Sequence, residues 1–162
     1  MKRVAVITAS DAGYRGERED SSGPKIIEII QKFGYTKVAY EILPDEQERL
    51  EKAMMEIIDQ GGADLVLTTG GTGFSVRDCT PEATKNVIER EVQGIPEAMR
   101  MMSMGFTKRA MLTRGVAGIR KSALIVNLPG SPKAVAECLE YILPELDHGL
   151  EILLGEANNC AR

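Results

Sequence analysis

The sequence predicts an α/β fold, a three-layer α/β/α sandwich in which helices cover both faces of a mostly parallel central sheet. Two observations predict it. Short apolar runs rich in β-branched residues alternate along the chain with longer segments of helical periodicity. These runs are apolar almost throughout rather than at every second position, which is typical of strands buried on both faces of a parallel sheet. This alternation favours helices packed on a parallel sheet, with ligands bound at the carboxyl ends of the strands.

Composition narrows the function before any motif is considered. The chain of 162 residues is 43% hydrophobic, which suits one domain over residues 1–162 with a core of its own. Because the formal net charge is −4, we do not expect a nucleic-acid-binding protein, which needs clustered basic surface. No apolar run approaches the roughly 18 residues of a membrane span, so no membrane attachment is expected.

The three cysteines, Cys79, Cys138 and Cys160, are widely spaced, and no Cys-x-x-Cys or Cys/His zinc pattern occurs. Such cysteines favour a reducing, cytoplasmic setting. The apolar run before Asp11 follows basic residues as in a signal peptide, but it is too short for one.

The first strand and the first helix are expected at the N-terminus. Residues 3–10 (RVAVITAS) form a continuous run rich in β-branched residues, which indicates a buried strand. A polar loop over 11–23 follows. Residues 24–34 then predict a helix, since Pro24 stands at its first position and Gly34 just past its end.

The second and third strands flank an amphipathic helix. Residues 36–43 (TKVAYEIL) predict the second strand, and 63–70 (ADLVLTTG) predict the third, which is buried. Between them, 45–62 predicts a helix, because apolar residues recur on one of its faces. These residues are Leu50, Ala53, Met54, Ile57 and Ile58.

Two further helices are expected after the third strand. Residues 80–90 predict a helix with Thr80 as its N-cap and Pro81 next to it. Residues 95–106 predict a Met-rich helix. We interpret its methionines as packing or as part of a subunit contact, since Met fills irregular cores and interfaces. They are Met99, Met101, Met102 and Met104.

The C-terminal part of the chain holds one more strand and the last helical region. Residues 110–122 predict an extended excursion or a short hairpin. Residues 123–130 (ALIVNLPG) predict a buried strand. Residues 131–155 predict one helix or two, with a break at Pro144, because a proline inside a helix removes a hydrogen bond.

Glycines, capping residues and prolines follow three of these strands where helices begin. They lie at 21–24, at 70–73 with Thr80 and Pro81, and at 129–132. Since helix N-termini present free amides and a partial positive charge, several of them at one sheet edge favour an anion site. The same residues suit ordinary strand-to-helix turns, and both interpretations stay open. No Gly-Lys-Ser/Thr follows the glycines, so they are not a P-loop.

Three aspartates, Asp11, Asp45 and Asp78, are expected at the carboxyl ends of strands. A structural role is open for each. Asp11 could close a turn, Asp45 could cap a helix with Glu48 in a capping box, and Asp78 suits a helix start. A functional role is open as well, because carboxylates beside phosphate-binding amides make sense when Mg²⁺ lies between them. Mg²⁺ takes one or two carboxylates together with phosphate oxygens.

The only histidine, His148, lies in the C-terminal helical region, remote from these loops. No Ser-His or Cys-His pair can therefore be proposed for nucleophilic catalysis. Phosphoryl and nucleotidyl transfer can run on positioning and metal electrostatics, so the residues favour that chemistry over acyl transfer.

Several motifs together resemble a known family. They span nearly the whole chain and read TASD (8–11), DSSGPKI (20–26), LPDEQERL (43–50), LVLTTGGTGFSVRDCTPEAT (65–84) and IRKSALIVNLPGSPKAVAECL (119–139). In these stretches the sequence resembles the molybdopterin adenylyltransferases of molybdenum-cofactor biosynthesis, the MogA type, which are related to the G domain of gephyrin.

The resemblance implies a molybdopterin-binding α/β fold and a homotrimer, which is the usual assembly of the family. It also implies a reaction in which AMP from Mg-ATP is joined to the terminal phosphate of molybdopterin and pyrophosphate leaves. Because that nucleophile is an ionised phosphate, no general base is required, which agrees with the lack of a candidate histidine. A contact with the protein that inserts molybdate is a further expectation.

The resemblance also implies site residues. Asp45 and Asp78 match the family's two key acids, and we assign them to catalysis and to Mg²⁺. The residues that match nucleotide or pterin binding are Ser10, Asp11, Gly70, Gly71, Thr72, Gly73, Phe74, Ser103, Asn127, Pro129, Gly130, Ser131 and Lys133. After Ser103 the sequence departs from the family, since TKRAMLTR replaces the more usual Thr-Pro before Ala-Met-Leu. The local pterin contact is therefore open.

Two other functions stay open beside the enzyme. A MoaB-type protein would share the fold and bind molybdopterin with lost or altered activity. The motifs RDCTPEAT and NLPGSPK favour the enzyme, because a non-catalytic relative would be expected to lose some of these polar residues. A scaffolding role as in gephyrin is the third interpretation, although no linker or second domain is recognisable.

Overall fold

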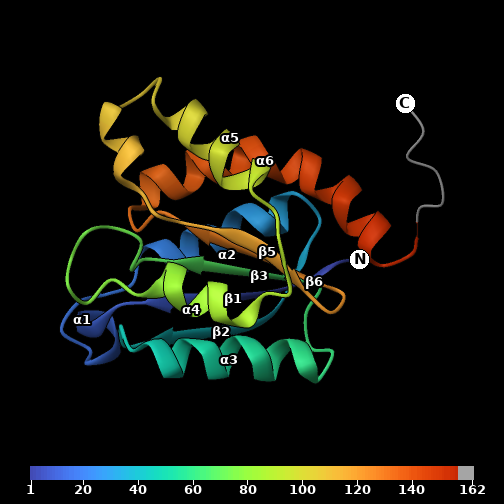
Figure 1. Ribbon diagram of the computed structural model, residues 1–162, viewed down its shortest axis with the longest axis horizontal. Helices are drawn as coiled ribbons and strands as arrows, with labels where there is room; N and C mark the ends of the chain where they lie inside the picture. The colour runs from blue at the N-terminus through green and yellow to red at the C-terminus, as the bar shows by residue number, and fades with distance from the viewer. Residues whose placement is uncertain (157–162) are drawn as a thin grey trace.

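A computed structural model describes residues 1–156 of the chain (Figure 1). Its sheet has six strands in the order β2-β1-β3-β6-β5-β4. β1, β2, β3 and β6 pair in parallel, whereas β5 pairs antiparallel with β6 and β4 antiparallel with β5. The strands are β1 (Arg3–Ala9), β2 (Thr36–Leu43), β3 (Leu65–Thr69), β4 (Arg90–Glu91), β5 (Ala117–Arg120) and β6 (Ala123–Leu128).

Helices cover both faces of this sheet, which confirms the predicted three-layer sandwich. In Figure 1, α5 and α6 lie above the sheet and α3 lies below it. The helices are α1 (Asp11–Tyr14), α2 (Ser22–Lys32), α3 (Gln47–Asp59), α4 (Thr80–Val87), α5 (Gly94–Ser103), α6 (Pro132–Leu153) and the 3₁₀ helix η1 (Lys108–Leu112). No helix among residues 1–156 combines the length and the apolarity that crossing a bilayer requires.

The central parallel strands β1, β3 and β6 bury both of their faces, as their apolar runs predict, whereas β2 at the edge of the sheet is partly exposed. Along β1, Val4 and Val6 pack into the core under α2, α5 and α6, whereas Ala5 and Ile7 pack into the core over α3 and α4. Successive side chains of a strand point to opposite faces, so a strand that is apolar at every position serves two cores at once. Because β1, β2, β3 and β6 pair in parallel, their carboxyl ends meet at one edge of the sheet.

The C-terminal helix is continuous, and the predicted break at Pro144 is wrong. Pro144 lies inside α6 on its exposed side, so the carbonyl of Glu140 that it deprives of a partner is also on the water-facing side. Leu143 and Leu146 on either side of Pro144 are buried. The packing of these leucines offsets the lost hydrogen bond.

Other boundaries differ more modestly from the expectations. The loop predicted over 11–23 contains α1, and α2 begins at Ser22 rather than at Pro24. Residues 110–122 form neither a single excursion nor a hairpin of their own, because η1 occupies the first part and β5 turns back into β6. Cys160 lies outside the described residues.

The methionines of α5 divide into buried and exposed positions. Met99 is buried in the core, which confirms a packing role there, whereas Met101 and Met104 are exposed. A subunit contact for the exposed methionines stays a prediction.

Candidate functional site

A cavity of about 690 Å³ opens where the parallel strands end, within the size range of small-molecule sites. Each of the four parallel strands sends residues to it, as the strand-end argument predicts. The predicted residues that line it are Ser10, Asp11, Asp45, Gly70, Gly71, Asp78, Gly130 and Ser131. The sheet thus brings together segments that lie far apart in the sequence.

Asp45 lines this cavity and carries an unpaired carboxylate oxygen. Its Oδ2 accepts a hydrogen bond of 3.0 Å from the Asp11 amide, whereas its Oδ1 is buried and has no partner within the described part of the chain. Burial raises the pKa of Asp45, and the charges of Asp11 and Asp78 raise it further against the lowering effect of the amide. A buried oxygen without a hydrogen-bond partner destabilises the fold. A ligand that bonds to this oxygen would therefore stabilise the protein.

The capping-box interpretation of Asp45 is wrong. α3 begins at Gln47 with Glu46 at its N-cap, and no side chain makes a capping hydrogen bond there. The carboxylate of Asp45 turns toward Asp11 instead.

Arg77 forms a hydrogen-bonded ion pair with Asp11. Its Nε and Nη2 donate to the two carboxylate oxygens of Asp11 at 2.9 and 3.0 Å. This hydrogen-bonded ion pair lowers the pKa of Asp11 against the effect of burial. Sequence reasoning did not assign Arg77 to the site, because its partner Asp11 lies 66 residues away in the sequence.

The glycine loop after β3 contains two glycines, Gly70 and Gly71, at which a side chain would collide with neighbouring residues. A Cβ on Gly70, whose φ is +89°, would lie 2.3 Å from the Ala9 carbonyl oxygen. A Cβ on Gly71, whose φ is +65°, would lie 2.4 Å from Thr80 Oγ1 and 3.0 Å from Asp45 Oδ1. Only glycine combines this left-handed backbone with such close packing. The loop therefore places bare backbone beside the unpaired oxygen of Asp45.

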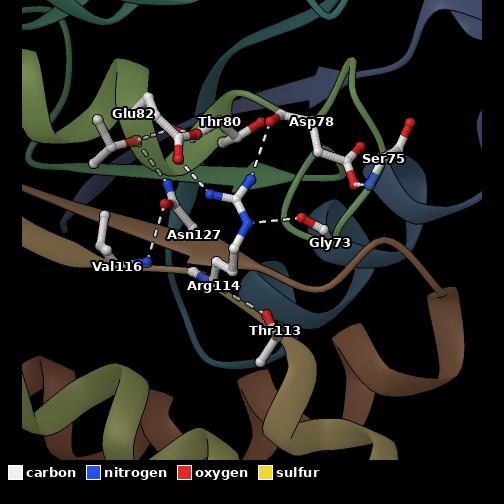
Figure 2. A network of polar contacts seen from close by, with 11 residues as sticks. Gly73, Ser75, Asp78, Thr80, Glu82, Thr113, Arg114, Val116 and Asn127 are labelled. Carbon is white, nitrogen blue, oxygen red and sulfur yellow. Dashed lines mark hydrogen bonds and ion pairs between the residues drawn. The ribbon is translucent and has the colours of Figure 1, made fainter.

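Asp78 closes the same loop. Its Oδ2 accepts a hydrogen bond of 3.1 Å from the Ser75 amide, and its own amide donates to the Ser75 carbonyl at 3.0 Å (Figure 2). A Cβ on Gly73 would lie 2.9 Å from Asp78 Oδ2, so the chain folds tightly around this carboxylate. Asp78 is positioned by its own loop before any ligand binds.

Thr80 does not act as the predicted N-cap of α4. Cys79 occupies the capping position without a side-chain bond, and Thr80 Oγ1 donates to the Gly70 carbonyl at 2.9 Å. The Thr80 amide donates to the Gly71 carbonyl at 3.1 Å. Thr80 therefore anchors the glycines of the loop rather than the helix.

The loop after β6 is anchored on both sides. The Gly130 carbonyl accepts from Ser22 Oγ at 2.7 Å, and the Pro129 carbonyl accepts from Thr69 Oγ1 at 2.7 Å. Ser131 caps α6, since its Oγ accepts from the Ala134 amide at 3.1 Å. The N-terminus of α6 thus faces the cavity, where its amides and dipole favour an anion.

Positive side chains also line the cavity. Arg15, Arg18 and Arg77 all contribute to its wall. Together with the helix N-termini they offset part of the negative charge of the carboxylates that line the same cavity.

Asp20 is a structural residue of the site that sequence reasoning did not single out. It accepts from Thr8 Oγ1 at 2.6 Å, from the Tyr40 hydroxyl at 2.5 Å and from the amides of Ser22 and Gly23. Burial acts to raise the pKa of Asp20, but these four hydrogen bonds outweigh it and lower the pKa. Its place shortly before a helix start was the available signal.

The remaining predicted residues lie outside this cavity. Ser103, Asn127 and Pro129 line a second, largely apolar cavity of about 220 Å³ between α5 and the start of α6. The Asn127 side chain is buried and bonds to Thr68 Oγ1, Thr84 Oγ1 and the Val116 amide. The predicted residues that line neither cavity are Thr72, Gly73, Phe74 and Lys133.

A search for relatives gives the family. Residues 5–148 match the model of a family described as a probable molybdopterin binding domain. This chain belongs to that family. A relative of Helicobacter pylori J99, the curated molybdopterin adenylyltransferase, is 42% identical over 94% of this chain and 88% of its own length. The molybdopterin adenylyltransferase of Escherichia coli K12 is 42% identical over 86% of this chain and 73% of its own length.

Solved structures of the proteins named MoaB and MogA share the fold. A crystal structure of the molybdopterin biosynthesis enzyme MoaB from Thermus thermophilus has a TM-score of 0.91 with 46% identity. The match covers 96% of this chain and 98% of that one. The resemblance inferred from the motifs is confirmed.

Proposed function

We propose that this protein is a molybdopterin adenylyltransferase of molybdenum-cofactor biosynthesis. A phosphate oxygen of molybdopterin bonds to the α-phosphorus of ATP, the bond from that phosphorus to the pyrophosphate breaks, and pyrophosphate leaves. The buried, unpaired oxygen of Asp45 beside the Gly70–Gly71 backbone is the observation that carries the proposal. The relatives named molybdopterin adenylyltransferase support the reaction.

The protein's task in this reaction is to hold phosphate. The amides of the glycine loop and of the α6 N-terminus would bind phosphate oxygens, and the arginines of the cavity would neutralise their charge. No general base is needed, because the attacking phosphate is already ionised. His148, exposed on α6, has no part in this scheme.

The acids fit a divalent cation. Asp45 Oδ1 lacks a partner within residues 1–156, and the carboxylate of Asp78 lines the same cavity. Mg²⁺ takes one or two carboxylates and completes its shell with phosphate oxygens and water. We assign Asp45 and Asp78 to Mg²⁺, which when bound would neutralise the charge that develops on the phosphates.

A MoaB-type role without transfer is the second interpretation, and the names of the curated relatives favour the enzyme. Pyrophosphate release separates the two. The wild type should release pyrophosphate from ATP only when molybdopterin is present. The Asp45→Ala and Asp78→Ala variants should stay folded and release none. A wild type that binds molybdopterin and releases no pyrophosphate would support the MoaB-type role instead.

We further propose a homotrimer that works in the cytoplasm and meets the protein that inserts molybdate. Exposed apolar side chains on α5 and η1 and between them, such as Met101, Phe106 and Met111, suit a subunit contact. Light scattering at micromolar concentration should give three times the monomer mass. A clean monomer would contradict the trimer and leave the reaction untouched.

A further inference from the structure

We infer that Arg114 is a positioning residue for Asp78, an inference that rests on the proposed function. Arg114 lies in the segment between η1 and β5. In Figure 2 its guanidinium lies between α4 and the part of the glycine loop that runs from Gly73 to Asp78. Arg114 ends the segment TKRAMLTR, but neither the strand-end argument nor the family resemblance assigns it a role.

Arg114 fastens both ends of the turn that carries Asp78. Its Nε donates to the Gly73 carbonyl at 2.7 Å, and its Nη2 donates to the Asp78 carbonyl at 3.0 Å. Its backbone amide donates to the Thr72 carbonyl at 2.8 Å. A planar guanidinium offers several donors in a fixed arrangement, so one side chain can fix the distance between two carbonyls. Gly73 and Asp78 are thereby clamped together (Figure 2).

Glu82 holds the other end of the guanidinium. Its carboxylate accepts from Arg114 Nη1 and forms an ion pair with it. Since Glu82 lies in the first turn of α4, Arg114 ties the loop to that helix.

The segment that carries Arg114 is itself fixed to the fold. Arg100 of α5 donates to the Gly115 carbonyl at 3.2 Å, and the Val116 amide donates to Asn127 Oδ1 at 3.1 Å. Thr113 and Gly115 line the second cavity, whereas Arg114 points from between them toward the loop of the first. The backbone next to Arg114 is therefore fixed, so its side chain can act as a rigid support for the loop.

The loop has two halves with separate anchors. Thr80 holds the carbonyls of Gly70 and Gly71, at the half nearest β3. Arg114 holds the half that ends at Asp78. Loss of Arg114 should therefore displace Asp78 and leave the Gly70–Gly71 cradle in place. This separation predicts an effect on turnover rather than on the binding of ATP.

The test compares Arg114→Gln and Arg114→Lys with a matched control, Arg120→Gln. Arg120 also bonds to a carboxylate and a carbonyl, those of Asp59 and Val87, but it does not line the cavity. We expect kcat of Arg114→Gln to fall by about tenfold to 100-fold, as for a displaced catalytic group, with little change in KM for ATP. Arg120→Gln should lower the melting temperature and leave both constants near wild type.

Arg114→Lys separates the ion pair from the clamp. Lysine keeps the charge beside Glu82, but a single ammonium cannot reach both carbonyls in the same way. We expect Arg114→Lys to melt near the wild type, because the ion pair is kept, and to regain only part of the kcat that Arg114→Gln loses. Full recovery of kcat with lysine would contradict the clamp, because charge alone would then suffice.

Hydrogen exchange tests the clamp without any turnover. The amides of Ser75 and Asp78 should exchange faster in Arg114→Gln than in the wild type, while the Thr80 amide keeps its protection. Unchanged exchange at Ser75 and Asp78, or a wild-type kcat in Arg114→Gln, would overturn the inference. If the wild type has no transferase activity, the proposed function fails and the exchange experiment alone decides on Arg114.

Discussion

Asp11 and Asp45 hold each other through reciprocal hydrogen bonds. The Asp11 amide donates to Asp45 Oδ2 at 3.0 Å, and the Asp45 amide donates to Asp11 Oδ1 at 3.0 Å. The two residues follow the neighbouring parallel strands β1 and β2, so the sheet itself sets their spacing. This exchange leaves Asp45 Oδ1 unpaired among the described residues and fixes the direction in which it faces. Two acids that stand 34 residues apart in the sequence thus form one rigid unit of the site.

Asp45→Asn should stabilise the protein while it abolishes turnover. The folded state raises the pKa of Asp45 above its ordinary 3.8, so ionised Asp45 destabilises the fold at neutral pH. We expect a gain of about 0.5–2 kcal/mol at pH 7, as for other stabilising changes at functional sites. Denaturant unfolding measures it. The gain should shrink as the pH falls toward 3.8, and a loss of stability at pH 7 would contradict this account.

Gly71→Ala should inactivate the enzyme, and Gly61→Ala provides its matched control. Both glycines have positive φ, +65° for Gly71 and +67° for Gly61, but a Cβ on Gly61 meets no atom within 4 Å. Each variant should lose about 1–2 kcal/mol for the left-handed backbone. Only Gly71→Ala should also lose activity, because its Cβ collides with Thr80 and crowds Asp45. Equal activities of the two variants would show that the close approach is unimportant.

Asp20→Asn should lower stability by more than Tyr40→Phe does. Asp20 accepts four hydrogen bonds, two of them from hydroxyls to the same oxygen. An amide cannot accept at both of its ends, so donors would be left unpaired at about 1–3 kcal/mol each. Tyr40→Phe removes one of the four bonds. Melting curves of the two variants make the comparison, and a smaller loss for Asp20→Asn would refute the assignment.

The ion pair of Asp59 with Arg120 and Lys121, which lies away from the site, should make the stability of the protein depend on pH. Hydrogen bonds with Arg120 and Lys121 lower the pKa of Asp59 from 3.8 to about 2. The contribution of this ion pair is therefore complete above pH 3.8 and is lost as the pH falls through about 2. Asp59→Asn should melt below the wild type at pH 7 and approach it near pH 2. A constant difference across that range would contradict the ion pair's role.

The sequence predicts the architecture because apolar strand-length runs recur along the chain between helical segments. Each buried parallel strand is apolar at nearly every position, and this pattern is typical of cover on both faces. The boundaries were less predictable. α6 passes through Pro144 because tertiary packing of Leu143 and Leu146 outweighs a local propensity, which no local pattern reveals.

The site was predictable in part for a related reason. Asp11, Asp45 and Asp78 follow strands, so their convergence could be inferred from topology. Arg77 and Arg114 could not, because their roles depend on contacts across 66 and 41 residues of sequence. Asn127 is a different case. It lies near the end of a strand, and its side chain bonds to groups inside the fold, so its predicted binding role stays a prediction.

The formation of adenylyl-molybdopterin from ATP tests the central claim most directly. Purified protein is incubated with ATP, Mg²⁺ and molybdopterin, and the product is detected by mass spectrometry. We expect the adenylylated product with the wild type and none with Asp45→Asn, which should be folded and at least as stable. Product formation by Asp45→Asn at the wild-type rate, or no product with the wild type, would contradict the account.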